Sequence, residues 1–177
     1  DIYSRGVAWN TNDTVSANDL YVVKATEGTT AENIDWTVSA GDVITVSAGD
    51  PIKTVDYEGA TWHTFKAHIE DLEPGATYFY RVGHPDTGWS KVGSFTIEKA
   101  ADKIDSIAFI NVTDSQEESE AGFAKWARVL KDAYGRMPDA DFVTHTGDFV
   151  NRSETKALHM EEWMYVFDQP MTQIMNG

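Results

Sequence analysis

Two aspartates that directly follow predicted strands are the residues of this sequence best suited to chemistry. Asp114 comes just after the apolar run Ile107–Val112, and Asp148 follows Gly147 after the run Asp141–Thr146. Neighbouring parallel strands lie about 4.8 Å apart and end at one edge of a sheet, so both carboxylates could reach one pair of metal ions. Ions about 3.5–4 Å apart need a bridging carboxylate, and a glycine allows the tight turn before it. The pair predicts metal-assisted chemistry, whereas either aspartate alone could simply cap the following helix.

Two amide side chains lie close to these aspartates in the sequence. Gln116 is two places after Asp114, and Asn151 is three places after Asp148. Their neutral oxygens could ligate a metal weakly or hold a metal-bound water, and they could equally be turn or cap residues. The predicted metal-binding residues are therefore Asp114, Asp148, Gln116 and Asn151. We interpret His145 as a strand residue packed beside the site.

The elements that must position these residues follow from the hydrophobic pattern after residue 103. Between the two apolar strands, a helix is indicated by apolar residues at helical spacing: Phe123, Trp126, Ala127, Leu130 and Tyr134. Gly135 and Pro138 are predicted to end that helix. A second helical pattern begins at about Glu154 and includes Leu158, Trp163, Val166 and Phe167. The order β-α-β-α is the beginning of an open α/β sheet.

The first half of the chain has a different character. It is rich in β-branched and aromatic residues, interrupted at short intervals by turn formers, which predicts short strands spaced as in a β-sandwich. The candidate strands are Gly6–Asn10, Leu20–Thr26, Val43–Ser47, His63–Ile69, Thr77–Val82 and Lys91–Thr96. The charged segment Glu98–Lys103 lacks apolar periodicity, and we place the domain boundary there.

The most specific all-β signal is the segment from Asp71 to Val82. Leu72 is expected to close the core, and Pro74 with Gly75 to turn the chain. Tyr78 is expected to fold back so that its hydroxyl bonds the main chain near the turn, the arrangement called a tyrosine corner.

Composition narrows the function classes. The chain of 177 residues has 29 acidic against 14 basic residues and a net charge of −15, which disfavours a nucleic-acid partner. It has no cysteine, so any metal must be held by oxygen and imidazole ligands. No apolar run approaches the roughly 18 residues that a membrane helix needs, so no membrane partner is expected.

The corner sequence, with Trp9 on an early strand and the Trp89–Phe95 strand at the end, resembles the fibronectin type III-like domain at the front of purple acid phosphatases. The two strand-tip aspartates, about thirty residues apart, resemble the first two blocks of the calcineurin-like metallophosphoesterases. The resemblance implies a mixed fold: an all-β domain at 1–98, then a calcineurin-like α/β segment at 104–177. It also implies that Asp114 binds the first metal and Asp148 bridges both.

For the intact protein, the resemblance implies a phosphatase whose pair of Fe, Zn or Mn ions activates a water to hydrolyse phosphate esters. It further implies a secreted or cell-surface location, although Asp1–Gly6 do not form a signal peptide. Two positions depart from the family pattern. Gln116 stands where purple acid phosphatases have Gly, and Asn151 stands where they have a colour-giving Tyr, so an iron charge-transfer colour is not expected.

The family's third block, Gly-Asn-His-Glu or Asp, does not occur in the sequence. We therefore expect the α/β domain to be truncated, the metal site to be incomplete, and the chain to contain no catalytic residue and to be inactive alone. An unfinished sheet would leave an exposed edge, through which a homo-oligomer could form.

A competing class is a non-enzymatic binding or adhesion protein, in which the fibronectin-like module contacts a polymer or a partner and the α/β domain is degenerate. Trp36, Trp62 and Trp89, if exposed, could stack on sugar rings or on a protein surface. A longer reading frame with Gly-Asn-His and Gly-His-x-His would favour the enzyme instead.

Overall fold

The computed structural model describes residues 3–12, 18–57, 59–117 and 119–151. The chain divides into two compact units, Asp1–Ile104 and Asp105–Gly177, and each is described by itself. Within the described residues, no helix is long and apolar enough to cross a membrane.

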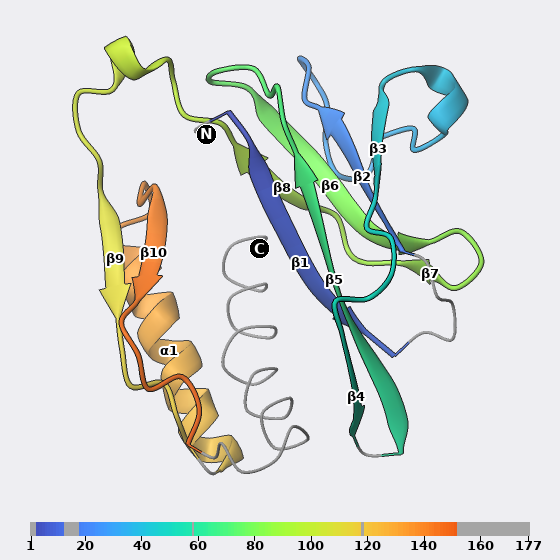
Figure 1. Cartoon of the computed structure of the whole chain (residues 1–177). Coiled ribbons are helices and arrows are strands. Elements are labelled where there is room, and N and C mark those ends of the chain that lie inside the picture. The colour runs from blue at the N-terminus through green and yellow to red at the C-terminus, as the bar shows by residue number, and fades with distance from the viewer. Residues whose placement is uncertain (1–2, 13–17, 58, 118, 152–177) are drawn as a thin grey trace. The chain divides into compact units, whose positions relative to one another are not determined.

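The first unit consists of two antiparallel sheets (Figure 1). One sheet has the order β1-β5-β4, and the other has the order β3-β2-β6-β7, with β8 also paired to β6. Short 3-10 helices cover Val38–Ala40 and Ala101–Lys103. The strands are β1 (Arg5–Thr11), β2 (Asp19–Lys24), β3 (Val43–Ser47), β4 (Lys53–Tyr57), β5 (Ala60–Ile69), β6 (Thr77–His84), β7 (Gly88–Trp89) and β8 (Gly93–Thr96).

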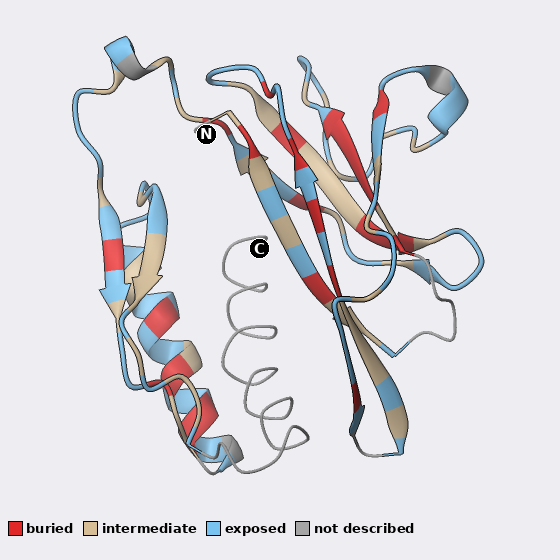
Figure 2. Cartoon of the chain, in the orientation of Figure 1, coloured by how far each residue is buried: buried red, intermediate tan, exposed pale blue. Residues whose placement is uncertain are grey.

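One hydrophobic core joins the two sheets, which makes the unit a sandwich. Buried residues alternate with exposed ones along β5, as the period of a strand requires (Figure 2). Phe65 is fully buried and stacks on Trp9 of β1, with 5.8 Å between ring centroids. The buried core residues are Trp9, Leu20, Val22, Phe65, Ala67, Ile69, Leu72, Tyr78, Val82 and Ile97.

The turn before β6 is fixed by Tyr78. The Glu73 backbone amide donates a hydrogen bond to the Tyr78 hydroxyl at 3.0 Å, while the buried Tyr78 ring stacks on Phe95. Gly75 has φ 74°, a left-handed conformation that suits glycine, and follows the exposed Pro74. Leu72 is buried, and its amide donates to the Tyr3 carbonyl at 2.9 Å. The segment is thereby tied to the residue Tyr3, just before β1, and to Phe95 on β8.

We expect Tyr78→Phe to lower the free energy of unfolding of the sandwich by about 1–2 kcal/mol, because it leaves the Glu73 amide without its acceptor. Urea denaturation measures the change. Tyr21→Phe is the matched control: Tyr21 is also buried, and its hydroxyl makes no hydrogen bond within the described residues. Equal losses in both variants would contradict the expectation.

All six strands predicted in the first half are confirmed, with ends shifted by a few residues. Two strands were missed. Among the β4 residues whose burial is described, Val55 alone is buried, so no clear alternation is seen, and β7 has only two residues, too few for a periodic signal.

The second unit begins with a parallel β-α-β arrangement. It contains β9 (Phe109–Val112), α1 (Glu120–Arg136) and β10 (Phe142–His145), with Phe142 opposite Phe109 in the register. The helix starts at the cap residue Ser119, whose hydroxyl accepts from the Gly122 amide at 3.1 Å. Its buried stripe is Phe123, Trp126 and Leu130.

The predicted parallel strands and the helix between them are confirmed, but the predicted helix end is wrong in one detail. Gly135 lies inside α1, which continues to Arg136 and is capped at Met137, directly before Pro138. An exposed glycine costs a helix only about 1 kcal/mol, whereas proline restricts the residue before it, so the end follows the proline. The second predicted helix, from about Glu154, lies outside the described residues.

Candidate metal centre

The loops after β9 and β10 lie side by side and carry the two aspartates. The Asp114 amide donates to the Gly147 carbonyl, and the Gln116 amide donates to the Asp148 carbonyl, each at 3.2 Å. Asp114 has φ 54° and Asp148 has φ 49°. Left-handed backbone is uncommon for residues other than glycine, although Asp tolerates it, and such residues cluster at functional sites. The structure thus brings both exposed aspartates to one edge of the parallel pair.

His145, the last residue of β10, holds these two loops together. Its Nδ1 accepts from the Gly147 amide at 3.2 Å, which places the ring proton on Nε2. Nε2 then donates to Ser115 Oγ at 2.9 Å, and Ser115 Oγ donates to the Phe149 carbonyl at 3.3 Å. Both ring nitrogens are occupied by protein atoms. His145 is therefore a positioning residue in this geometry.

The His145 ring is also enclosed by aromatic side chains. It stacks on Phe149 with 4.0 Å between centroids and meets the edge of Trp126 at 5.7 Å. Burial lowers the pKa of His145 below its usual 6.5, and the charge of Asp114 opposes that shift. The neutral ring is the form that the two hydrogen bonds require.

We expect the second unit to be most stable above about pH 6.5 and to lose stability as the pH falls below that value, because the unfolded chain then takes up a proton that folded His145 resists. The sign follows from a pKa that is lower in the folded than in the unfolded state. An NMR titration of the His145 ring proton tests this. A His145 pKa at or above the usual 6.5 would contradict it.

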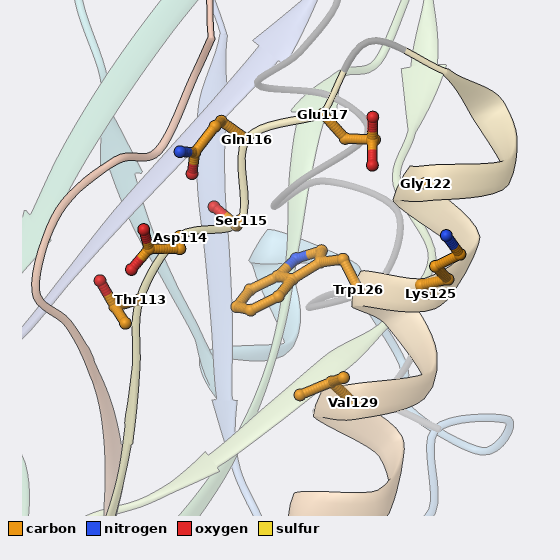
Figure 3. Close-up of a pocket in the computed structure, with 9 residues that line it drawn as sticks. All are labelled: Thr113, Asp114, Ser115, Gln116, Glu117, Gly122, Lys125, Trp126 and Val129. Carbon is orange, nitrogen blue, oxygen red and sulfur yellow. The ribbon is translucent and has the colours of Figure 1, made fainter.

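A shallow pocket opens beside Asp114, between the loop after β9 and the first turns of α1. Figure 3 shows the Trp126 ring lying between that loop and the helix, with Asp114 and Gln116 on the same loop. Gln116 Oε1 is buried and has no hydrogen-bond partner among the described residues. The pocket is lined by Thr113, Asp114, Ser115, Gln116, Glu117, Gly122, Lys125, Trp126 and Val129.

The oxygen ligands at this site are of the type that a hard cation prefers, but they are too few to complete its coordination. Asp114 and Asp148 supply carboxylate oxygens, and the unpartnered Gln116 oxygen beside them is a further donor. Asn151 is exposed and follows the Asp148 loop at the end of the described range. Across the described ranges, no group of three or more His, Cys, Asp or Glu side chains could hold a metal ion. The assignment of all four residues as ligands stays a prediction.

Sequence reasoning missed the part that Ser115 plays. Ser115 is only 2% exposed, and its hydroxyl links the two loops through His145 and Phe149. A buried serine between Asp114 and Gln116 gives no periodic signal, and its partners lie about thirty residues further along the chain. Only the pairing of β9 with β10 reveals it.

Residues 3–97 match the family model of the purple acid phosphatase N-terminal domain. The chain belongs to this family, as its sequence indicated. A solved structure of purple acid phosphatase PPD1, from seeds of yellow lupin (Lupinus luteus), resembles the chain with a TM-score of 0.56 and 14% sequence identity. That likeness covers 99% of this chain and 31% of the lupin protein, and it supports the fold alone. No curated protein matches the sequence.

Proposed function

We propose that this chain is the amino-terminal part of a metal-dependent phosphoesterase that hydrolyses phosphate esters. The observation that carries the proposal is the pair Asp114 and Asp148, held at neighbouring strand ends in a chain of the purple acid phosphatase N-terminal family. Because the chain spans about a third of the lupin phosphatase, the activity is proposed for the whole protein.

In this function the residues of the second unit present oxygen ligands in a fixed arrangement. Asp114 would hold the first metal ion, and Asp148 would be a ligand shared by both. His145 and Ser115 keep the two loops in register, which limits how far the carboxylates can separate. A bound metal pair would supply a water of lowered pKa and charge stabilisation at the phosphoryl group. The remaining ligands must come from residues outside the described part of the chain.

A binding or adhesion function is the weaker candidate. Its supporting feature was a row of exposed tryptophans, but Trp36, Trp62 and Trp89 are all half-buried. Trp36 and Trp89 pack against Arg81, and Trp62 lies on β5 of the other sheet. The three rings therefore do not form one stacking surface.

The experiment is an assay of p-nitrophenyl phosphate hydrolysis by the complete gene product with added Fe, Zn or Mn. We expect metal-dependent turnover that falls by more than about 100-fold in Asp148→Asn. Even the mutation of a residue that only hydrogen-bonds a metal ligand typically lowers metal affinity or activity by about 10–100-fold. Asp132→Asn, an exposed aspartate on α1, is the matched control. Absence of turnover in the complete protein, or equal turnover in both variants, would contradict the proposed function.

A further inference from the structure

An arginine held among three aromatic rings stands on the outer face of the larger sheet. Arg81 lies on β6 directly opposite Tyr21 of β2. Its guanidinium carbon is 4.2 Å from the centroid of Trp89, 4.6 Å from that of Trp36 and 5.5 Å from that of Tyr21. We call these four residues the Arg81 box.

The three rings of the box come from three separate parts of the sandwich. Tyr21 packs with Val23 and Val43 in a small buried cluster on this face, apart from the main core. Trp36 comes from the long connection between β2 and β3, which is closed by its own bonds, such as Asn33 Nδ2 to the Gly28 carbonyl at 2.8 Å.

Trp89 reaches the box because β7 approaches β6 unusually closely. Gly83 pairs with Trp89, and a Cβ added at Gly83 would lie 2.2 Å from the Gly88 carbonyl oxygen. Only glycine fits there, and Gly83 also has φ 144°, a conformation that other residues rarely adopt. The close approach holds the Trp89 ring against Tyr21, with 4.4 Å between their centroids.

Among the described residues, the charge of Arg81 has no hydrogen-bond or ion-pair partner. Its Nε is buried without a hydrogen-bond acceptor, and no ion pair or hydrogen bond to its guanidinium occurs among the described residues. Arg5, the other arginine of the sandwich, by contrast pairs with Glu98 at 2.5 Å. The acidic residues of the Trp36 loop, Glu27, Glu32, Asp35 and Asp42, make no ion pair with Arg81.

Because Nε is buried, the accessible edge of the guanidinium is formed by its two terminal amino groups. We propose that this edge binds an oxyanion, a phosphate or carboxylate group, in a bidentate manner. The aromatic faces hold the guanidinium plane rigid, so little side-chain freedom is lost on binding. A planar fork of two donors matches the geometry of two oxygens on one phosphorus or carbon. Burial also lowers the pKa of Arg81, a penalty that a bound anion would offset.

The test is a titration of the 15N-labelled 177-residue chain with inorganic phosphate and, separately, with acetate, with chloride keeping the ionic strength constant. We expect a saturable shift of the Arg81 Nε–Hε signal with one or both anions, accompanied by shifts of the Trp36 and Trp89 indole signals. The stronger of the two anions identifies the ligand class. Shifts no larger than those caused by chloride alone would overturn the proposal and leave the box as a purely structural cation–π cluster.

Arg81→Lys keeps the charge and removes the fork. It should weaken anion binding about tenfold or more, as expected for the loss of a bidentate charged pair. Binding in this variant is followed by the indole signals. Arg128→Lys on α1, an exposed site, is the matched control and should bind as the unaltered chain does. Equal affinity in Arg81→Lys and the unaltered chain would contradict the inference. The direct Nε–Hε titration does not depend on whether either variant folds.

Discussion

Phe65→Ala is expected to lower the free energy of unfolding of the sandwich by about 3–5 kcal/mol. Phe65 is fully buried on β5, and its ring stacks on Trp9 of the neighbouring strand β1. Truncation removes apolar contacts and leaves a cavity between the two sheets. The neighbouring side chains are already closely packed and cannot move to fill it without strain. A loss of this size is a large fraction of the stability of a small domain. Urea or thermal denaturation of the first unit, followed by circular dichroism, measures it.

Ile52→Ala controls for the loss of an exposed apolar side chain in the same unit. Ile52 is 58% exposed, so its truncation should change the unfolding free energy by less than about 0.5 kcal/mol. A Phe65→Ala loss as small as that of Ile52→Ala would mean that the two sheets do not share the core described above.

The second large effect is expected for His145→Phe. Phenylalanine can still stack on Phe149, but it cannot accept from the Gly147 amide or donate to Ser115. Leaving those part-buried polar groups unsatisfied should destabilise the second unit by about 2–4 kcal/mol. The loops that carry Asp114 and Asp148 should then lose their mutual order. Amide hydrogen exchange at Asp114 and Gln116, which donate to the Gly147 and Asp148 carbonyls of the other loop, reports that loss directly.

Thr146→Val provides the comparison for His145→Phe. The Thr146 hydroxyl donates one exposed bond, to the Val112 carbonyl at 3.3 Å, between the same two strands. Its removal should leave exchange at Asp114 and Gln116 nearly unchanged. If His145→Phe exchanged no faster than Thr146→Val at these amides, His145 would not be the residue that positions the two loops.

Much of the sandwich could be predicted because its strands alternate clearly between core and solvent. The β5 segment around Phe65, Ala67 and Ile69 shows this best, since each is buried and the residues between them are exposed. β4, an edge strand, could not be predicted, because Lys53, Thr54 and Asp56 are exposed and, of the β4 residues whose burial is described, only Val55 is buried. The Gly135 error has a different origin: an exposed glycine costs a helix only about 1 kcal/mol, so α1 continues past it and ends where Pro138 restricts Met137.

The candidate metal centre could also be predicted only in part from the sequence. Asp114 and Asp148 could be located because strand-tip aspartates need only the order of elements to be recognised. The His145 bridge could not, since its bonds join residues about thirty positions apart and depend on the parallel register of β9 and β10. The Arg81 box was likewise hidden, because Trp36 lies on a loop whose path no periodicity describes.

The most direct test of the metal centre is Mn²⁺ titration of the 15N-labelled chain, read out as paramagnetic line broadening. We predict that broadening begins at residues 113–116 and 147–149, is lost in the double variant Asp114→Asn/Asp148→Asn, and persists in Asp132→Asn. Broadening spread over the acidic surface, and unchanged in the double variant, would contradict the assignment of Asp114 and Asp148 as metal ligands.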